Sequence, residues 1–129
     1  MKKKPPLRKR LIKRLDVLWS LAIRAKYPRC VVCGKEPTQA HHAIVRKAQT
    51  MGVRWLPKNG IGLCYVCHIH RLHGQAGDKQ FLDKYIEILN QEIPAEEQLN
   101  IQQISHQITK FSVSDLQELV IEFESRGTK

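Results

Sequence analysis

The sequence predicts a small α+β fold, and two kinds of segment carry that prediction. Residues 39–45 and 61–64 have the length and pattern of short strands. Residues 9–26 and 78–91 instead repeat apolar side chains every three or four positions, as amphipathic helices do, and Ser112 has the character of a helix cap before another such segment. Because the chain has 129 residues and no internal repeat, we expect one domain with appendages.

Charge is distributed unevenly along the chain. The net charge is +10, and residues 1–29 hold 11 Lys and Arg against one acidic residue, Asp16. Residues 30–77 hold six basic residues against one acidic residue, whereas residues 78–129 hold five against ten. A basic first part with an acidic extension is typical of a protein that binds a polyanion. We therefore divide the chain into three parts: a disordered basic arm at 1–8, a core with an N-terminal helix at 9–77, and a helical extension at 78–129 that packs on the core or on a second copy in a homodimer.

Nothing in the sequence indicates a membrane protein. The chain contains no apolar run of ~18 residues, and no signal-peptide pattern follows Met1. We therefore expect a soluble, cytoplasmic protein with no membrane partner. The basic helix at 9–26 leaves one alternative open, since such a helix also suits an anionic lipid surface.

All four cysteines lie in two pairs of the same spacing, Cys30-x-x-Cys33 and Cys64-x-x-Cys67. Two residues between thiolates let one tight turn direct both sulfurs at a single ion, and two such turns complete a tetrahedral zinc site. A core this small needs a staple, which a structural zinc supplies. We expect structural zinc at these four residues; a redox pair or an iron–sulfur site is the alternative.

The residues around the second cysteine pair follow a specific order. His41 and His42 lie on the first expected strand, Asn59 precedes the second strand, and His68 opens the helix that follows it. With the framing cysteine pairs, this order of strand, loop, strand and helix resembles the HNH, or ββα-metal, nuclease family in its zinc-stapled branch. The resemblance covers residues 28–74. It implies a small zinc-stapled ββα-metal core, flanked here by an N-terminal basic helix and C-terminal helices.

The resemblance also implies catalytic roles. His41 is similar to the family's first metal ligand, and His68 to the ligand at the helix start. His42 is similar to the general base that takes a proton from water, and Asn59 to the asparagine that ties the loop so that the base is correctly aimed. The rival interpretation of the histidines is a domain that keeps the shape without the chemistry, or one that uses histidine in the zinc shell.

The implied catalytic cofactor is a divalent ion. Mg²⁺ is the usual ion for phosphoryl chemistry, and histidine ligands also suit Mn²⁺, Ni²⁺ or Zn²⁺. Relatives often carry a further histidine one helical turn after the first helix ligand, where this chain has Leu72. His73 follows His68 by five residues, a turn of ~500° on a regular helix. We therefore expect His73 to bind the catalytic ion only if the helix is already breaking; a phosphate contact is the alternative.

The implied function is a DNA endonuclease that hydrolyses phosphodiester bonds. Lys and Arg bind the DNA backbone through counterion release, and the candidate contacts are Arg46, Lys47, Arg54, Lys58, Arg8, Lys9, Arg10, Lys13 and Arg14. For the first four of these, a solvated loop is the alternative. The small size and basic arm resemble compact HNH proteins of phages and prophages, including those linked to recombination. This implies a bacterial or phage-infected host cell and a phage or host recombination or packaging protein as a further partner. The alternative function is a non-catalytic, zinc-stabilised DNA-binding or adaptor module.

Overall fold

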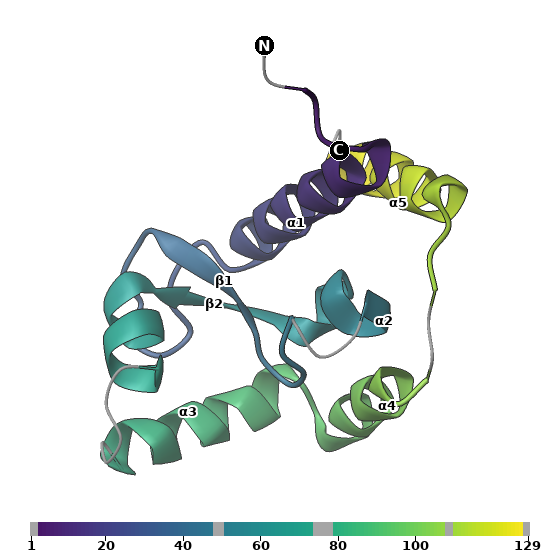
Figure 1. Cartoon of the computed structure of the whole chain (residues 1–129). Helices are drawn as coiled ribbons and strands as arrows, with labels where there is room; N and C mark the ends of the chain where they lie inside the picture. The colour runs from purple at the N-terminus through teal and green to yellow at the C-terminus, as the bar shows by residue number, and fades with distance from the viewer. Residues whose placement is uncertain (1–2, 48–50, 74–78, 108–109, 128–129) are drawn as a thin grey trace.

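A two-stranded antiparallel sheet lies between the helices of the fold (Figure 1). The computed structural model describes residues 3–47, 51–73, 79–107 and 110–127, without the side chains of residues 73 and 127. Strand β1 (Thr38–His42) pairs with β2 (Gly60–Cys64), and His42 lies opposite Gly60 in the ladder. The predicted α+β class is therefore confirmed. Both strands form within the expected segments or one residue beyond them.

Helix α1 (Leu7–Lys26) covers one face of this sheet (Figure 1). The buried residues of α1 recur at helical spacing, as predicted, and are Leu15, Leu18, Trp19 and Ile23. Strand β2 carries glycine where the helix end comes close, because a Cβ added at Gly62 would lie 2.5 Å from the Cβ of Tyr27. The helix therefore approaches the sheet more closely than a side chain at this position would permit.

The polar sequence of residues 46–58, between the two strands, predicts a loop, and that prediction is wrong in part. Within it the chain forms a short helix, α2 (Met51–Arg54), and a 3₁₀ turn, η1 (Pro57–Asn59). Val53 is fully buried and Trp55 is 5% exposed, so apolar side chains within the loop fold it against the core. Trp55 thus anchors the loop.

A helix follows β2 as predicted, but its form differs from the prediction. The segment η2 (Val66–His73) is a π-helix, in which hydrogen bonds join residues five apart instead of four. The argument from a ~500° turn assumed a regular α-helix, so it does not apply to this segment. Short π-helical stretches occur frequently at functional sites.

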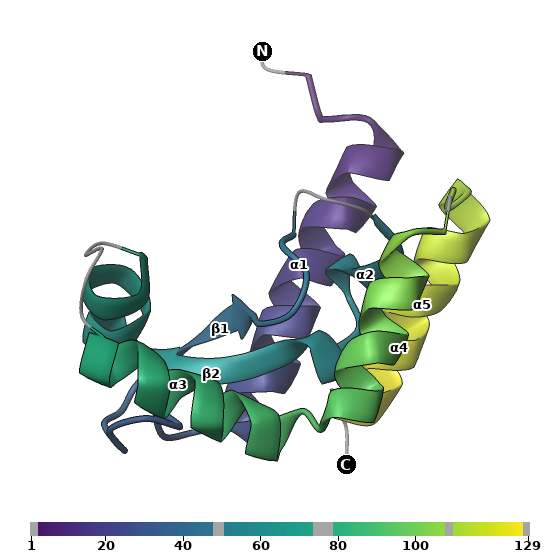
Figure 2. The same cartoon turned by 90° about the horizontal axis from the view of Figure 1, so that it is seen from below.

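Three helices form the C-terminal extension: α3 (Lys79–Glu92), α4 (Ala95–Ser105) and α5 (Val113–Gly127). Helix α3 passes the sheet on the side away from α1, whereas α5 packs along α1 (Figures 1 and 2). The predicted cap at Ser112 is confirmed, because its Oγ accepts from the Asp115 amide at 3.0 Å while the Asp115 carboxylate accepts from the Ser112 amide at 2.9 Å. Among the described residues, none of the helices combines the length and the apolar character needed to cross a bilayer.

Candidate metal centre and histidine cavity

The four cysteines converge on one point at the end of the sheet. Cys30 and Cys33 lie in a turn before β1, whereas Cys64 ends β2 and Cys67 lies in η2. The first turn closes through the Gly34 amide, which donates to the Cys30 carbonyl at 2.9 Å, and Gly34 takes a φ of 77° that glycine adopts without strain. All four sulfurs lie within 4.8 Å of one another. The cluster is therefore able to bind a metal ion.

The geometry of this cluster fits a zinc ion. Zn–S bonds of about 2.3 Å in a tetrahedron separate the sulfurs by roughly 3.8 Å, and the Sγ atoms of Cys33 and Cys64 are 3.4 Å apart. Burial raises the pKa of Cys67, and the neighbouring cysteine sulfurs raise it further. For Cys30, burial also opposes the thiolate, but backbone hydrogen bonds outweigh it and lower the pKa to about 7. Four thiolates are compatible here only if a cation neutralises them.

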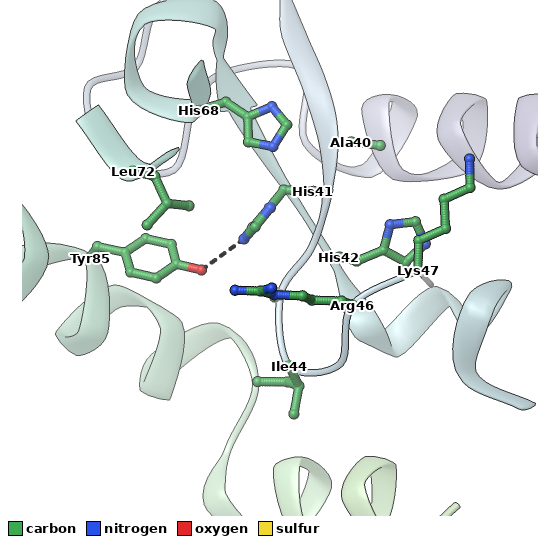
Figure 3. A pocket seen from close by; sticks show the side chains of 10 residues that line it. Ala40, His41, His42, Ile44, Arg46, Lys47, His68, Leu72 and Tyr85 are labelled. Atoms are coloured by element: carbon green, nitrogen blue, oxygen red, sulfur yellow. Dashed lines mark hydrogen bonds between the residues drawn. The ribbon is translucent and has the colours of Figure 1, made fainter. Parts of the chain in front are cut away.

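A second group of side chains lies on one face of β1. The rings of His41 and His68 are 5.0 Å apart, edge to face. The hydroxyl of Tyr85, on α3, lies 3.1 Å from Nε2 of His41 (Figure 3). The side-chain oxygen of Gln39 lies 2.8 Å from Nδ1 of His68. Because an amide oxygen only accepts, His68 donates through Nδ1 and carries its lone pair on Nε2. Burial raises the pKa of Tyr85 to about 12, so the hydroxyl is protonated at neutral pH.

His42 projects from the opposite face of β1, toward α1. Its ring stacks on the indole of Trp19, with centroids 3.8 Å apart and planes 12° apart. Its Nε2 donates to the backbone carbonyl of Arg54 at 2.9 Å, which leaves the lone pair of the neutral ring on Nδ1. Burial lowers the pKa of His42, and this effect outweighs the hydrogen bond to the carbonyl, which raises it. The ring is therefore neutral at neutral pH and able to accept a proton.

The two faces meet in one cavity because β1 ends at His42. His41, His42 and His68 all line a hollow of about 710 Å³, together with the basic residues Arg46 and Lys47 (Figure 3). Successive strand side chains point to opposite faces, and the cavity extends around the end of the strand to reach both. The cavity therefore contains the facing imidazoles of His41 and His68 together with the imidazole of His42, which is oriented separately.

Asn59 fixes the segment that follows β1. Its side chain is fully buried. Its Oδ1 accepts from the amides of Ile44 and Val45 at 2.9 and 3.1 Å, and its Nδ2 donates to the Val45 carbonyl at 2.8 Å. The amide of Ala43 also donates to the Asn59 backbone carbonyl at 2.9 Å. These bonds hold the strand end, and with it the backbone beside His42, in one conformation.

The other candidate residues fall into separate groups. Five of them are exposed on α1, namely Arg8, Lys9, Arg10, Lys13 and Arg14. Lys58 is exposed beside α4, with its Nζ 3.5 Å from the Glu97 carboxylate. The Arg54 side chain is only 19% exposed and its guanidinium binds Asp16, so it lies inside the packing of the core. The side chain of His73 is outside the described part of the chain, and Leu72 lines the cavity.

Sequence reasoning missed the side chains that contact the histidines. Gln39 lies two residues before His41, so the alternation of a strand places both on one face; that signal was available. Tyr85 comes from the acidic extension, 44 residues after His41, and no local pattern connects the two. Trp19 lies in the core, but its stacking on His42 had no sequence signal.

The comparisons with known proteins add no relative. No protein-family model, no curated protein and no solved structure matches this chain.

Proposed function

We propose that this protein is a metal-dependent DNA endonuclease of the HNH class. One observation carries the proposal: His41, His42 and His68 line one cavity, next to a four-cysteine cluster that is complete without them. Four sulfurs satisfy a tetrahedral structural ion, so the histidines remain for a different task. A pair of facing imidazoles and a neutral base, with basic residues beside them, are the groups that phosphodiester hydrolysis requires.

His41 and His68 would hold the divalent ion. Tyr85 hydrogen-bonds to a ring nitrogen of His41, and Gln39 to a ring nitrogen of His68. Histidines that bind metals commonly make such a bond with their other ring nitrogen, which fixes the orientation of the ring. Two imidazole nitrogens suit Ni²⁺ or Zn²⁺, whereas Mg²⁺ and Mn²⁺ prefer oxygen ligands and would take most of their coordination from phosphate and water oxygens. When bound, the ion supplies positive charge that stabilises the transition state and the departing oxygen.

His42 would act as the general base. Its Nδ1 takes a proton from a water molecule as the water oxygen forms a bond to phosphorus and the bond from phosphorus to the 3′ oxygen breaks. The 3′ oxygen takes a proton from solvent, which leaves a 3′ hydroxyl and a 5′ phosphate. The Arg54 carbonyl and the Trp19 ring keep His42 in one orientation during this transfer.

DNA is the partner that the charge distribution favours. Arg46 and Lys47 line the cavity, and further cations are exposed on α1. Such a surface attracts the sugar-phosphate backbone without reading its sequence. A finer form of the proposal is a phage or prophage nuclease linked to recombination, with a homodimer formed through the extension.

The proposal is tested with a nuclease assay on linear, nicked, flapped and four-way DNA, each with Mg²⁺, Mn²⁺ or Ni²⁺. Wild-type protein is expected to cleave at least one of these substrates. His42→Ala is expected to lose cleavage and keep DNA binding, whereas the exposed His106→Ala serves as the matched control and keeps both. Absence of cleavage by wild-type protein under every condition would overturn the endonuclease.

A second candidate is a zinc-stabilised DNA-binding module without cleavage. The observation in its favour is Leu72, an apolar residue in the wall of the cavity, at the position where members of the HNH family often carry a further histidine. Within the described side chains, the cavity then offers two imidazoles for an ion and His42 for the base. DNA binding that persists while no metal supports cleavage would favour this candidate.

A further inference from the structure

Asp16 is the one acidic residue among the first 29 residues, and it makes an extensive set of contacts. Its carboxylate accepts from Nε and Nη2 of Arg54 at 2.9 and 2.7 Å and from the indole N–H of Trp55 at 2.9 Å. Nζ of Lys47 lies 3.5 Å from the same carboxylate. A bidentate pair with an arginine fixes both distance and orientation. Helix α1 thus clamps the end of α2 by way of one side chain.

The clamped segment is the one that holds the proposed base. The backbone carbonyl of Arg54 accepts the hydrogen bond from Nε2 of His42, so the side chain of this residue binds Asp16 while its main chain binds His42. Trp19, three residues after Asp16 on the same side of α1, stacks on the His42 ring. Helix α1 therefore fixes His42 at two points: directly through an aromatic face, and indirectly through the carbonyl.

We propose that Asp16 is a positioning residue for the general base: by clamping Arg54 and Trp55, it sets the carbonyl that keeps His42 in the Nε2–H tautomer with Nδ1 available to water. This inference rests on the proposed nuclease function for its catalytic consequence, but the tautomer is a property of the protein alone. A carboxylate that served only to stabilise the fold would leave the tautomer unchanged once the variant had folded.

The test uses the full-length, zinc-loaded chain and the variant Asp16→Asn, which keeps the shape of the side chain but loses its charge and one acceptor oxygen. A long-range proton–nitrogen correlation spectrum of the labelled imidazoles, recorded at about pH 8 where an ordinary histidine is neutral, distinguishes the two tautomers. Wild type is expected to show His42 as Nε2–H. Asp16→Asn is expected to show a mixture, with kcat lowered by about 10²-fold and KM changed little.

Three further variants sharpen the result. Asp16→Glu retains the carboxylate and is expected to recover part of kcat and of the tautomer preference. Glu124→Gln removes another ion pair of α1, with Arg14 at 3.2 Å, and is the control that leaves both unchanged. If Asp16→Asn fails to bind zinc and fold, Trp55→Phe, which removes a single hydrogen bond from the clamp, gives the same two readouts.

The outcomes separate this inference from the proposed function. A shifted tautomer in a protein that never cleaves DNA would support the clamp and overturn the nuclease. A folded Asp16→Asn with the tautomer and kcat of wild type would overturn the clamp while the nuclease stands. A loss of kcat without any change of tautomer would also overturn it, because the effect would then not pass through His42.

Discussion

Gly60 is a position where the addition of one methyl group tests how closely α1 must lie against the sheet. A Cβ there would lie 2.5 Å from Cδ1 and 2.6 Å from Cγ1 of Ile23, and 2.8 Å from Cζ2 of Trp19. Carbon atoms in contact are ordinarily about 3.5–4.0 Å apart, so Gly60→Ala requires a displacement of about 1 Å. Ile23 is 1% exposed and the Trp19 ring is stacked on His42, so neither has room to move.

The sign of the effect follows from two opposing contributions. The backbone of Gly60, with φ −128° and ψ 141°, is one that alanine adopts, and restriction of the unfolded chain would by itself stabilise the variant by about 0.4–1 kcal/mol. Overpacking of a closed core costs about 1–3 kcal/mol. We expect Gly60→Ala to lower the free energy of unfolding by about 1–2 kcal/mol.

The assay is urea unfolding of the zinc-bound protein, followed by tryptophan fluorescence. Removing the obstructing atoms should relieve the clash, so Gly60→Ala is expected to cost about 1 kcal/mol less in an Ile23→Ala background than in wild type. A Gly60→Ala protein as stable as wild type, or more stable, would refute the close approach of α1. Equal costs in the two backgrounds would refute Ile23 as the obstacle.

Three other predictions follow from the same structure. Asn59→Ala leaves two amides and a carbonyl unpaired in the core, so we expect a loss of about 3 kcal/mol or more in urea unfolding, whereas exposed Asn100→Ala should change little; a small effect at Asn59 would contradict the buried network. Chelation of the metal, or Cys67→Ser, is expected to release about one zinc per chain and unfold the protein, as measured by a zinc dye and circular dichroism; a fold that survives with no metal would show that the cluster is not the staple. Burial alone would raise the pKa of Asp16, but hydrogen bonds from Arg54 and Trp55 and the charges of Arg54 and Lys47 outweigh it and lower that pKa. Near these pKa values the native state then binds fewer protons than the unfolded state, so ionised Asp16 stabilises the fold above its ordinary pKa, and this contribution is lost as pH falls through the lowered pKa of the folded state. Below about pH 4, the free energy of unfolding of wild type should therefore fall more steeply with pH than that of Asp16→Asn. Parallel curves for the two proteins would contradict the prediction.

The sequence predicted the parts of the site that depend on short spacing. Two C-x-x-C pairs carry their own geometry, because each turn needs only local backbone, and the four sulfurs do gather. The strands also followed from local pattern. The π-helical form of η2 did not, since its apolar periodicity is that of any helix and the choice between them depends on tertiary packing.

Long-range contacts account for most of what the sequence did not reveal. Arg54 had the appearance of a surface cation in a polar loop, yet it pairs with Asp16, 38 residues earlier. Nothing in the composition of either segment specifies that pairing. Apolar residues within the loop, such as Val53, were the available indication that the loop would fold against the core. The many charged residues around them favoured the interpretation of an exposed loop.

The site is divided between the two faces of β1, and each flanking helix contacts a different histidine of the site. His41 meets α3 through Tyr85, whereas His42 meets α1 through Trp19. The strand thus separates the imidazole that would hold an ion from the imidazole that would accept a proton, and this keeps a positive charge on one from lying against the lone pair of the other. Both helices lie outside the motif that gives the chain its resemblance to nucleases. In the proposed nuclease the motif would therefore provide the reacting groups, while His41 and His42 each contact a helix that the motif does not contain.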